Sequence, residues 1–174
     1  TYAGTSMTEI ADSGLSTGSD RQWLFRLVAP ATGANNVVVT ITGGNMHIRT
    51  GNISFTGAHQ TVFSTPQTAV LEAGSSISDT FTSAVGDMVV YGVTVGNDDA
   101  HQVDVGDLTA RYDLNGSGNG EGAAGGTAPG AASVLAALAW ATSGSAAAAG
   151  VNVKAAAADV AFVTRPQRPI PMAA

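Results

Sequence analysis

The sequence predicts an all-β fold, an antiparallel β-sandwich of jelly-roll type, and two observations point to this class. Apolar and polar residues alternate over several short segments, and glycine, asparagine or proline ends each of them. No segment with a helical apolar period separates these strands, which argues against a βαβ fold. The 174 residues are 44% hydrophobic, enough to fill one core, so a single domain is expected.

Five segments are expected to form strands in the first half of the chain. The alternation is clearest in Val37–Thr42 and in Met88–Val95, where every second residue is a large apolar one. Shorter strands are expected at Trp23–Val28, Ile53–Thr56 and Ile77–Thr82, each bounded by turn residues.

The alanine-rich region that follows residue 130 is ambiguous from composition. Alanine favours helix, and Ala131–Ala149 would propagate one well. However, Val134, Leu138 and Trp140 share even positions, and a helix would turn Trp140 away from the other two. We therefore expect a strand over Ala132–Thr142.

The remaining segments are expected to be a turn, a short strand, a loop and a tail. A turn at Ser143–Ser145 would lead into a partner strand at Val151–Val153, and the glycine-rich Asn115–Gly130 is expected to be a flexible loop. The sandwich module then spans residues 1–158. Residues 159–174 form an extended, polyproline-like tail that would lie along a neighbouring subunit, the alternative being a frayed terminus. The candidate assembly residues in it are Arg165, Pro166, Arg168, Pro169 and Pro171.

Charged residues make up 11% of the chain, against about 25% in typical soluble proteins. The surface must therefore carry many small and weakly polar side chains, as in proteins that lie outside cells or within large assemblies. The net charge is −6 and Lys154 is the only lysine, so no basic stripe is available for nucleic acid. No long apolar run or basic amphipathic helix predicts membrane insertion. The absence of cysteine excludes disulfides and thiolate ligands.

Several segments together resemble an uncharacterised family of bacterial and phage β-sandwich (jelly-roll-like) surface modules. The resemblance implies a fold and a virion, extracellular or cell-surface setting, and it implies no catalytic residues. The segments that carry it are Tyr2–Thr8, Leu27–Gly33, Ile53–Gly57, Ser83–Val90, Trp140 and Gly150–Lys154.

One departure from this resemblance concerns Tyr2–Thr8. In proteins of this kind the segment follows several strands that open the sandwich, whereas here it opens the chain. The module is therefore expected to lack its first strands, which either belong to upstream sequence or are supplied by a neighbour. Missing strands expose unpaired backbone edges, and such edges favour pairing with another chain.

The best metal candidate is a calcium-type loop that begins at Asp113. Asp113, Asn115 and Ser117 place oxygen ligands at alternate positions, and glycine follows at the sixth position. The twelfth position is Ala124 instead of a bidentate glutamate, so the favoured interpretation is a turn without cofactor, with Ca²⁺ as the alternative. A second acidic group that includes a histidine is also more typical of a solvated loop. Its residues are Asp98, Asp99, His101, Asp104 and Asp107.

No catalytic constellation is apparent, so the chain is expected not to be an enzyme. The string Gly120–Gly125 satisfies G-x-G-x-x-G but lacks the preceding strand and following helix of a dinucleotide site. His47, His59 and His101 lie in polar, turn-like contexts, and no nucleophile elbow is present.

Two aromatic residues are candidates for sugar stacking. Trp23 and Tyr112 border loops, whereas Trp140 and Tyr91 lie on the apolar faces of their strands and are expected in the core. The sequence therefore favours a structural or assembly module of a phage particle or an extracellular filament, with other subunits or copies as partners. The alternative is a carbohydrate-binding or adhesion module whose partners are surface glycans.

Overall fold

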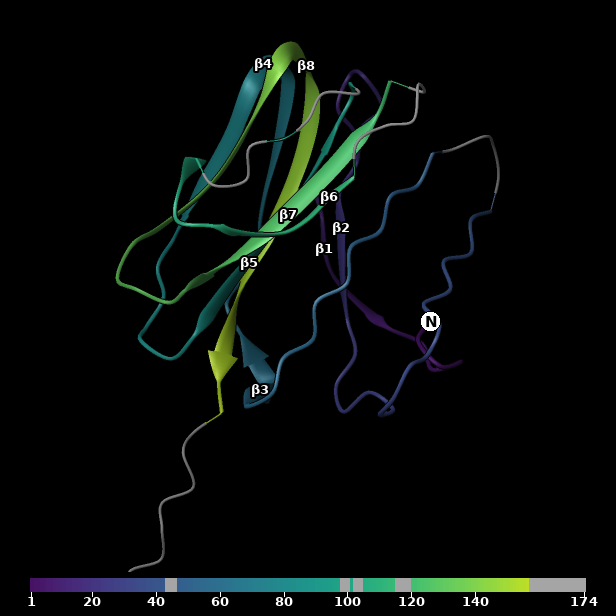
Figure 1. The fold of residues 1–174 in the computed structure, drawn as a ribbon, viewed down its shortest axis with the longest axis vertical. Coiled ribbons are helices and arrows are strands. Elements are labelled where there is room, and N and C mark those ends of the chain that lie inside the picture. Colours follow the sequence, from purple (N-terminus) through teal and green to yellow (C-terminus); the bar gives the residue numbers. More distant parts are fainter. Residues whose placement is uncertain (43–46, 98–100, 102–104, 115–119, 157–174) are drawn as a thin grey trace, which may run out of the picture.

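The computed structural model describes residues 1–42, 47–97, 101, 105–114 and 120–156 (Figure 1). All strand pairs in this part of the chain are antiparallel and no α-helix occurs in it, so the predicted all-β class is confirmed. The same part contains no helix long and apolar enough to cross a membrane. A jelly-roll strand order stays a prediction. The strands are β1 (Thr8–Asp12), β2 (Trp23–Arg26), β3 (Ala58–Phe63), β4 (Gln67–Phe81), β5 (Met88–Val95), β6 (Thr109–Leu114), β7 (Gly122–Pro129) and β8 (Val134–Ala155).

The strands form a two-stranded sheet and a six-stranded sheet. β1 pairs with β2, and the larger sheet has the order β3-β8-β5-β7-β6, with β4 also paired to β8. β8 has 22 residues and pairs with more than one strand along its length. Its residues 146–153 pair with β5, and its residues 134–150 pair with β4.

The long ribbon formed by β4 and β8 bends back on itself and so creates the two layers of the core. The strand register shifts on either side of Gly74, which pairs with Gly144. The two ends of β4 come together, because the Gln67 side-chain amide donates to the Thr80 carbonyl at 3.1 Å. Figure 1 shows this bend at the top of the molecule, where β4 and β8 curve together.

The core lies between the folded ribbon and the β5–β7 region of the larger sheet. Phe81, near the end of β4, packs edge-on against Tyr91 of β5, with ring centroids 6.0 Å apart. Alternate residues of β5 point into this core, as the sequence predicts. The large buried side chains of the core are Ile77, Phe81, Val89, Tyr91, Val93, Val95, Leu108, Val134, Leu138 and Trp140.

Trp140 stabilises the bend of the β4–β8 ribbon, because its indole N–H donates a hydrogen bond to the Gly74 carbonyl at 3.0 Å. We expect Trp140→Phe to lower the free energy of unfolding by about 1–2 kcal/mol, because the carbonyl loses its partner and the smaller ring leaves space. Urea denaturation measures this change. Trp23→Phe is the matched control, and an equal loss for both variants would contradict the role of the hydrogen bond at the bend.

The outer face of the larger sheet is covered by the β1–β2 hairpin. The Thr94 hydroxyl of β5 donates to the Gln22 side chain at 2.9 Å. The Ser145 hydroxyl of β8 donates to the buried Asp20 at 2.5 Å. These two contacts place the hairpin over β5 and β8, on the side opposite the folded ribbon.

Several predicted strands are confirmed with different bounds. Met88–Val95 matches β5, and Ile77–Thr82 lies almost wholly within β4. The strand predicted at Trp23–Val28 ends earlier, at Arg26. The strand predicted at Ala132–Thr142 begins at Val134, and the turn predicted at Ser143–Ser145 is wrong. The chain bends there while it stays paired, so Val151–Val153 belongs to the same strand.

The prediction that Asn115–Gly130 is a loop is wrong over Gly122–Pro129, which forms β7 and is almost entirely buried. β7 lies between β5 and β6, and its glycines leave room for the Tyr112 ring. A Cβ atom on Gly125 would lie 2.6 Å from that ring. The small residues are thus a packing requirement imposed by the neighbouring strand.

Two further predicted strands, Val37–Thr42 and Ile53–Thr56, are not strands in the structure. Val37 forms an isolated bridge with Tyr2, and the rest of its segment joins no sheet. The Ile53–Thr56 segment precedes β3, which begins only at Ala58. Both segments belong to a long excursion between β2 and β3, and their alternation predicts strand pairing that is not found among the described residues.

Candidate functional site

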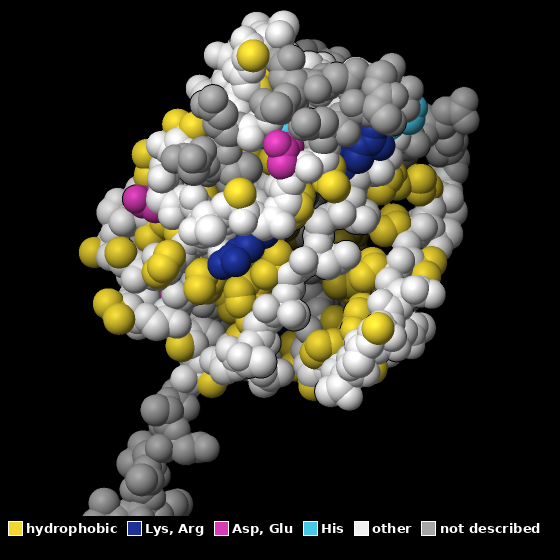
Figure 2. Space-filling model, viewed as in Figure 1, with side chains coloured by type: hydrophobic (Ala, Val, Ile, Leu, Met, Phe, Trp, Pro, Cys, Tyr) yellow, Lys and Arg dark blue, Asp and Glu magenta, His cyan; other side chains and the backbone are white. Residues whose placement is uncertain are grey.

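Residues 27–57, which we call the arm, hold the most unusual surface of the molecule. Figure 1 shows the arm as a long blue excursion to one side of the β-sheets, and Figure 2 shows hydrophobic side chains along it. Clusters of exposed apolar side chains are uncommon on isolated domains and often mark interaction sites. The exposed large hydrophobic residues of the arm are Val28, Val38, Val39, Ile41, Ile48 and Phe55.

The segment Val37–Thr42 of the arm is only partly paired. The Val38 amide donates to the Thr1 carbonyl at 2.9 Å, and the amino group of Thr1 donates to the Val38 carbonyl at 2.7 Å. Among the described residues, no backbone hydrogen bond joins residues 39–42 to a strand. Val39 is 53% exposed and Ile41 43% exposed. The segment thus has the sequence of a strand and lacks the neighbours of one.

Charge is unevenly divided along the chain. Residues 21–71 contain three arginines and no carboxylate, whereas residues 72–156 contain nine carboxylates and two cations. The first range includes the arm, and the second includes most of the β4 strand and the larger sheet. The arm and the body of the molecule therefore carry charge of opposite sign.

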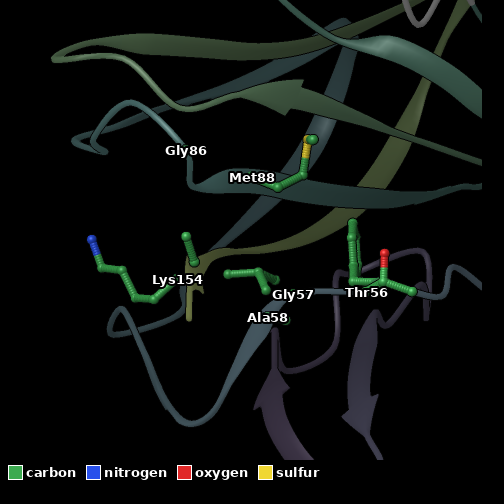
Figure 3. Close-up of a pocket in the computed structure, with 9 residues that line it drawn as sticks. Thr56, Gly57, Ala58, Gly86, Met88 and Lys154 are labelled. Carbon is green, nitrogen blue, oxygen red and sulfur yellow. The ribbon is translucent and has the colours of Figure 1, made fainter. Parts of the chain in front are cut away.

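A small hollow lies where β3, β5 and β8 meet (Figure 3). Its volume is about 90 Å³, room for one side chain and well below the several hundred Å³ of a typical small-molecule site. Phe55, Gly57, Met88 and Val153 contribute to its lining. Lys154 stands at its edge, and its amine donates to Asp87 at 2.8 Å. The hollow is therefore weakly suited to a charged ligand.

Asp87 joins three parts of the fold beside this hollow. Its carboxylate accepts hydrogen bonds from Lys154, from the Asn152 side chain at 3.2 Å, and from the backbone amides of Ala155 at 3.0 Å and Ala84 at 3.2 Å. The Lys154 contact, followed by the other three hydrogen bonds, holds the pKa of Asp87 well below its usual range although burial opposes the shift. Asp87 is a structural junction of β5, β8 and the preceding turn.

Asp113, the first residue of the predicted calcium loop, is already engaged. Its Oδ1 lies 2.7 Å from Nδ1 of His101, whose side chain is fully buried. Asn115 and Ser117 lie outside the described residues, so their part in a metal site stays a prediction. No group of three or more acidic or histidine side chains is arranged around a common point in the described part of the chain.

The second predicted acidic group is largely outside the described residues, as Asp98, Asp99 and Asp104 fall there. Asp107 caps β8, where its carboxylate accepts a hydrogen bond from the Leu135 amide at 2.7 Å. His101 turns toward Asp113, and its buried Nε2 lies near Gly122 and makes no hydrogen bond to any described residue. Asp107 and His101 thus bind different parts of the fold, the start of β8 and Asp113 respectively.

The two aromatic candidates for sugar stacking are not free platforms. The Tyr112 ring packs over Gly125, Gly92 and Gly51, and burial raises the pKa of its hydroxyl to about 12. Trp23 is partly exposed, but the Arg21 guanidinium lies 4.7 Å from its ring centroid. The Tyr112 ring therefore packs within the fold, and one face of the Trp23 ring is occupied by the Arg21 guanidinium.

The other two histidines each contact a polar group close by. His47 lies 3.1 Å from Glu121, which joins the arm to the start of β7. His59, on β3, accepts a hydrogen bond from the backbone amide of Thr61 at 3.2 Å. Each histidine therefore has a local structural role.

Sequence reasoning missed one feature of this site, which is the open edge of β4. The 15-residue β4 strand pairs with β8 alone among the described strands. The alternation of Ser76 and Ser78 with Ile77 indicates a strand with one polar face, but it does not report whether a second strand lies beside it. The predicted assembly residues in Arg165–Pro171 lie outside the described residues.

In comparisons with known proteins, no family model, no curated protein and no solved structure matches this chain.

Proposed function

We propose that this chain is a non-catalytic structural or assembly module of a phage particle or of an extracellular bacterial filament. The observation that carries the proposal is the arm segment Val37–Thr42, which has exposed apolar side chains and an open backbone. Exposed β-type segments of this kind pair readily with other chains. The low charged fraction of 11% and the resemblance to phage and bacterial surface modules support a location in a virion or outside the cell.

The carbohydrate-binding alternative finds less support. It depends on Trp23 and Tyr112 as exposed rings, and Tyr112 is packed on glycines instead. No other observation among the described residues favours a sugar site, so we do not develop this alternative. Its simplest test is whether Trp23→Ala alters binding to an array of surface glycans.

The assembly proposal predicts that the purified chain self-associates. Light scattering over a range of concentrations is expected to give a native mass above that of the 17.3 kDa monomer. Deletion of Arg165–Ala174 is expected to weaken this association about tenfold or more, because the tail is proposed to contact a neighbour. Its melting temperature should stay unchanged, which serves as the control for folding. A monomer at all accessible concentrations would contradict the proposal.

A further inference from the structure

We infer that residues 37–42 of one molecule add as a strand to the outer edge of β4, along Ser76–Phe81, in a second copy of this chain. The inference rests on the proposed assembly function and names its contact surface. The two segments that would pair lie on different molecules. The contact is therefore heterologous, and its repetition builds a ring or a filament.

The first argument is that both partners have backbone groups available for pairing. Residues 39–42 make no strand pairing within the described chain. The β4 strand has β8 as its one described partner strand, and within Ser76–Phe81 the Thr80 carbonyl also accepts a hydrogen bond from the Gln67 side chain at 3.1 Å, a contact that an added strand would replace. A strand that joins a sheet edge gains main-chain hydrogen bonds, and pockets beside alternate side chains give selectivity. The two segments are also equal in length, at six residues each.

The second argument is that the two faces match in polarity. In the second half of β4, Ile77 and Phe81 point into the core, and Asp79 between them accepts a hydrogen bond from the Tyr91 hydroxyl at 2.8 Å. Ser76, Ser78 and Thr80 on the other face are exposed. In residues 37–42, Val37, Val39 and Ile41 share one face, and Thr40 and Thr42 lie on the other.

Added in this orientation, the valine and isoleucine side chains of the arm extend the apolar layer of Ile77 and Phe81. The arm threonines then lie beside the serine and threonine side chains of β4, a cross-strand combination that stabilises sheets. Val38 is the exception to the match, and its backbone is already paired with Thr1. The opposite orientation would place Val39 among the exposed hydroxyls of β4.

The third argument is charge. The arm has Arg49 as its one formal charge and contains no carboxylate, whereas the β4 strand carries Glu72 and Asp79 and no cation. Glu72 is exposed at the bend of β4, where one of its carboxylate oxygens accepts hydrogen bonds from the backbone amide and the hydroxyl of Thr17. Opposite charges across an interface favour encounter and select the partner. The arm of a second copy therefore fits the β4 edge better than a surface of like charge would.

Cross-linking tests this arrangement directly, since the chain contains no cysteine. Thr40→Cys and Ser78→Cys are made in separate chains, mixed and oxidised, and the mixed disulfide dimer is measured by mass spectrometry. Thr40→Cys is also mixed with Thr80→Cys to allow for the neighbouring register. Side chains on the same face of paired strands are close enough to form a disulfide.

The matched control is Val39→Cys mixed with Ser78→Cys, because Val39 lies on the opposite face. We expect at least one of the two Thr40→Cys mixtures to give about tenfold more mixed dimer than this control. If the wild-type chain self-associates but all mixtures give equal yields, the inference is overturned while the assembly proposal stands. A wild-type chain that stays monomeric overturns both.

A second variant measures the energetic role of the arm without cross-linking. Val39→Asp is expected to raise the dissociation constant of the assembly at least about tenfold, with the melting temperature unchanged because Val39 is 53% exposed. Val85→Asp is the control, since Val85 is 95% exposed on the turn before β5 and lies outside both segments that are proposed to pair. Equal dissociation constants for the two variants would overturn the inference.

Discussion

Asp87→Ala is expected to lower the free energy of unfolding by roughly 2–4 kcal/mol, measured by urea denaturation at neutral pH. The carboxylate holds the last residues of β8 against the turn before β5 through three hydrogen bonds, and it accepts a fourth from Ala84 within that turn. Without it, the Asn152 side-chain NH₂ group loses its hydrogen-bond acceptor in a fully buried position, and Lys154 keeps its charge beside the sheet. Leaving such groups unsatisfied costs more than the net gain from the original bonds.

A matched variant separates this junction from the general effect of removing a surface charge. Asp107→Ala removes a carboxylate that accepts one backbone hydrogen bond, from Leu135. We expect its effect to be about 1 kcal/mol, the usual net contribution of one hydrogen bond. Equal losses for the two variants would show that the Asp87 junction does not form as described.

The same junction predicts a dependence of stability on pH. The pKa of Asp87 is lowered in the folded state, chiefly by Lys154, so its contribution is fully present above the unfolded pKa of about 4. It is lost progressively as the pH falls below that value toward the lowered folded pKa. The difference in unfolding free energy between wild type and Asp87→Asn should therefore shrink below about pH 4. A difference that stays constant down to pH 2 would contradict the lowered pKa.

The strands of the core were predictable because their side chains carry the pattern themselves. Met88–Val95 alternates large apolar residues with smaller ones, and the alternation corresponds to one buried face. Trp140 and Tyr91 were placed in the core on the same grounds and are 5% and 1% exposed. In these segments local propensity and tertiary packing agree, so each strand could be predicted from its own residues without knowledge of the strands beside it.

The bend of the β4–β8 ribbon was not predictable from local sequence. Ser143–Ser145 has the composition of a turn, yet the chain passes through it as a continuous strand. Pairing with β4 and the Trp140 hydrogen bond to Gly74 hold this region in the sheet, and both partners lie far away in sequence. A turn signal reports local preference only, and here long-range pairing outweighs it.

The sequence predicted Val37–Thr42 only as a strand and placed the assembly contacts in Arg165–Pro171. The strand is wrong for the described part of the chain, where only Val37 and Val38 of this segment pair, with Tyr2 and Thr1. Sequence pattern specifies that a strand needs a neighbour without specifying which molecule provides it. The open edge of β4 was missed because nothing in its own sequence reports whether a second strand lies beside it.

The glycine-rich strand β7 is the clearest case in which a neighbour decides the structure. Glycine in a strand interior weakens it and often marks close approach of another group. Here that group is the Tyr112 ring of β6, which packs over Gly125 of β7 and Gly92 of β5. The glycines that suggested a loop are therefore the residues that let three strands share one aromatic ring.

A double-mutant cycle tests this interpretation and has the largest expected effect. Tyr112→Ala is expected to lower the free energy of unfolding by about 3–5 kcal/mol, because a large ring is removed from a packed position. Gly125→Ala alone is expected to cost about 1–3 kcal/mol, since its new methyl group would lie 2.6 Å from the ring unless the ring moves. Urea denaturation measures each variant.

In the Tyr112→Ala background, Gly125→Ala should be neutral or stabilising, because the clash is gone and alanine restrains the unfolded chain more than glycine does. The two substitutions should thus deviate from additivity by about 1 kcal/mol or more. Losses that add within about 0.5 kcal/mol would mean that the ring does not rest on Gly125. The burial of β7 would then need another cause, since the small residues of that strand would have no ring to accommodate.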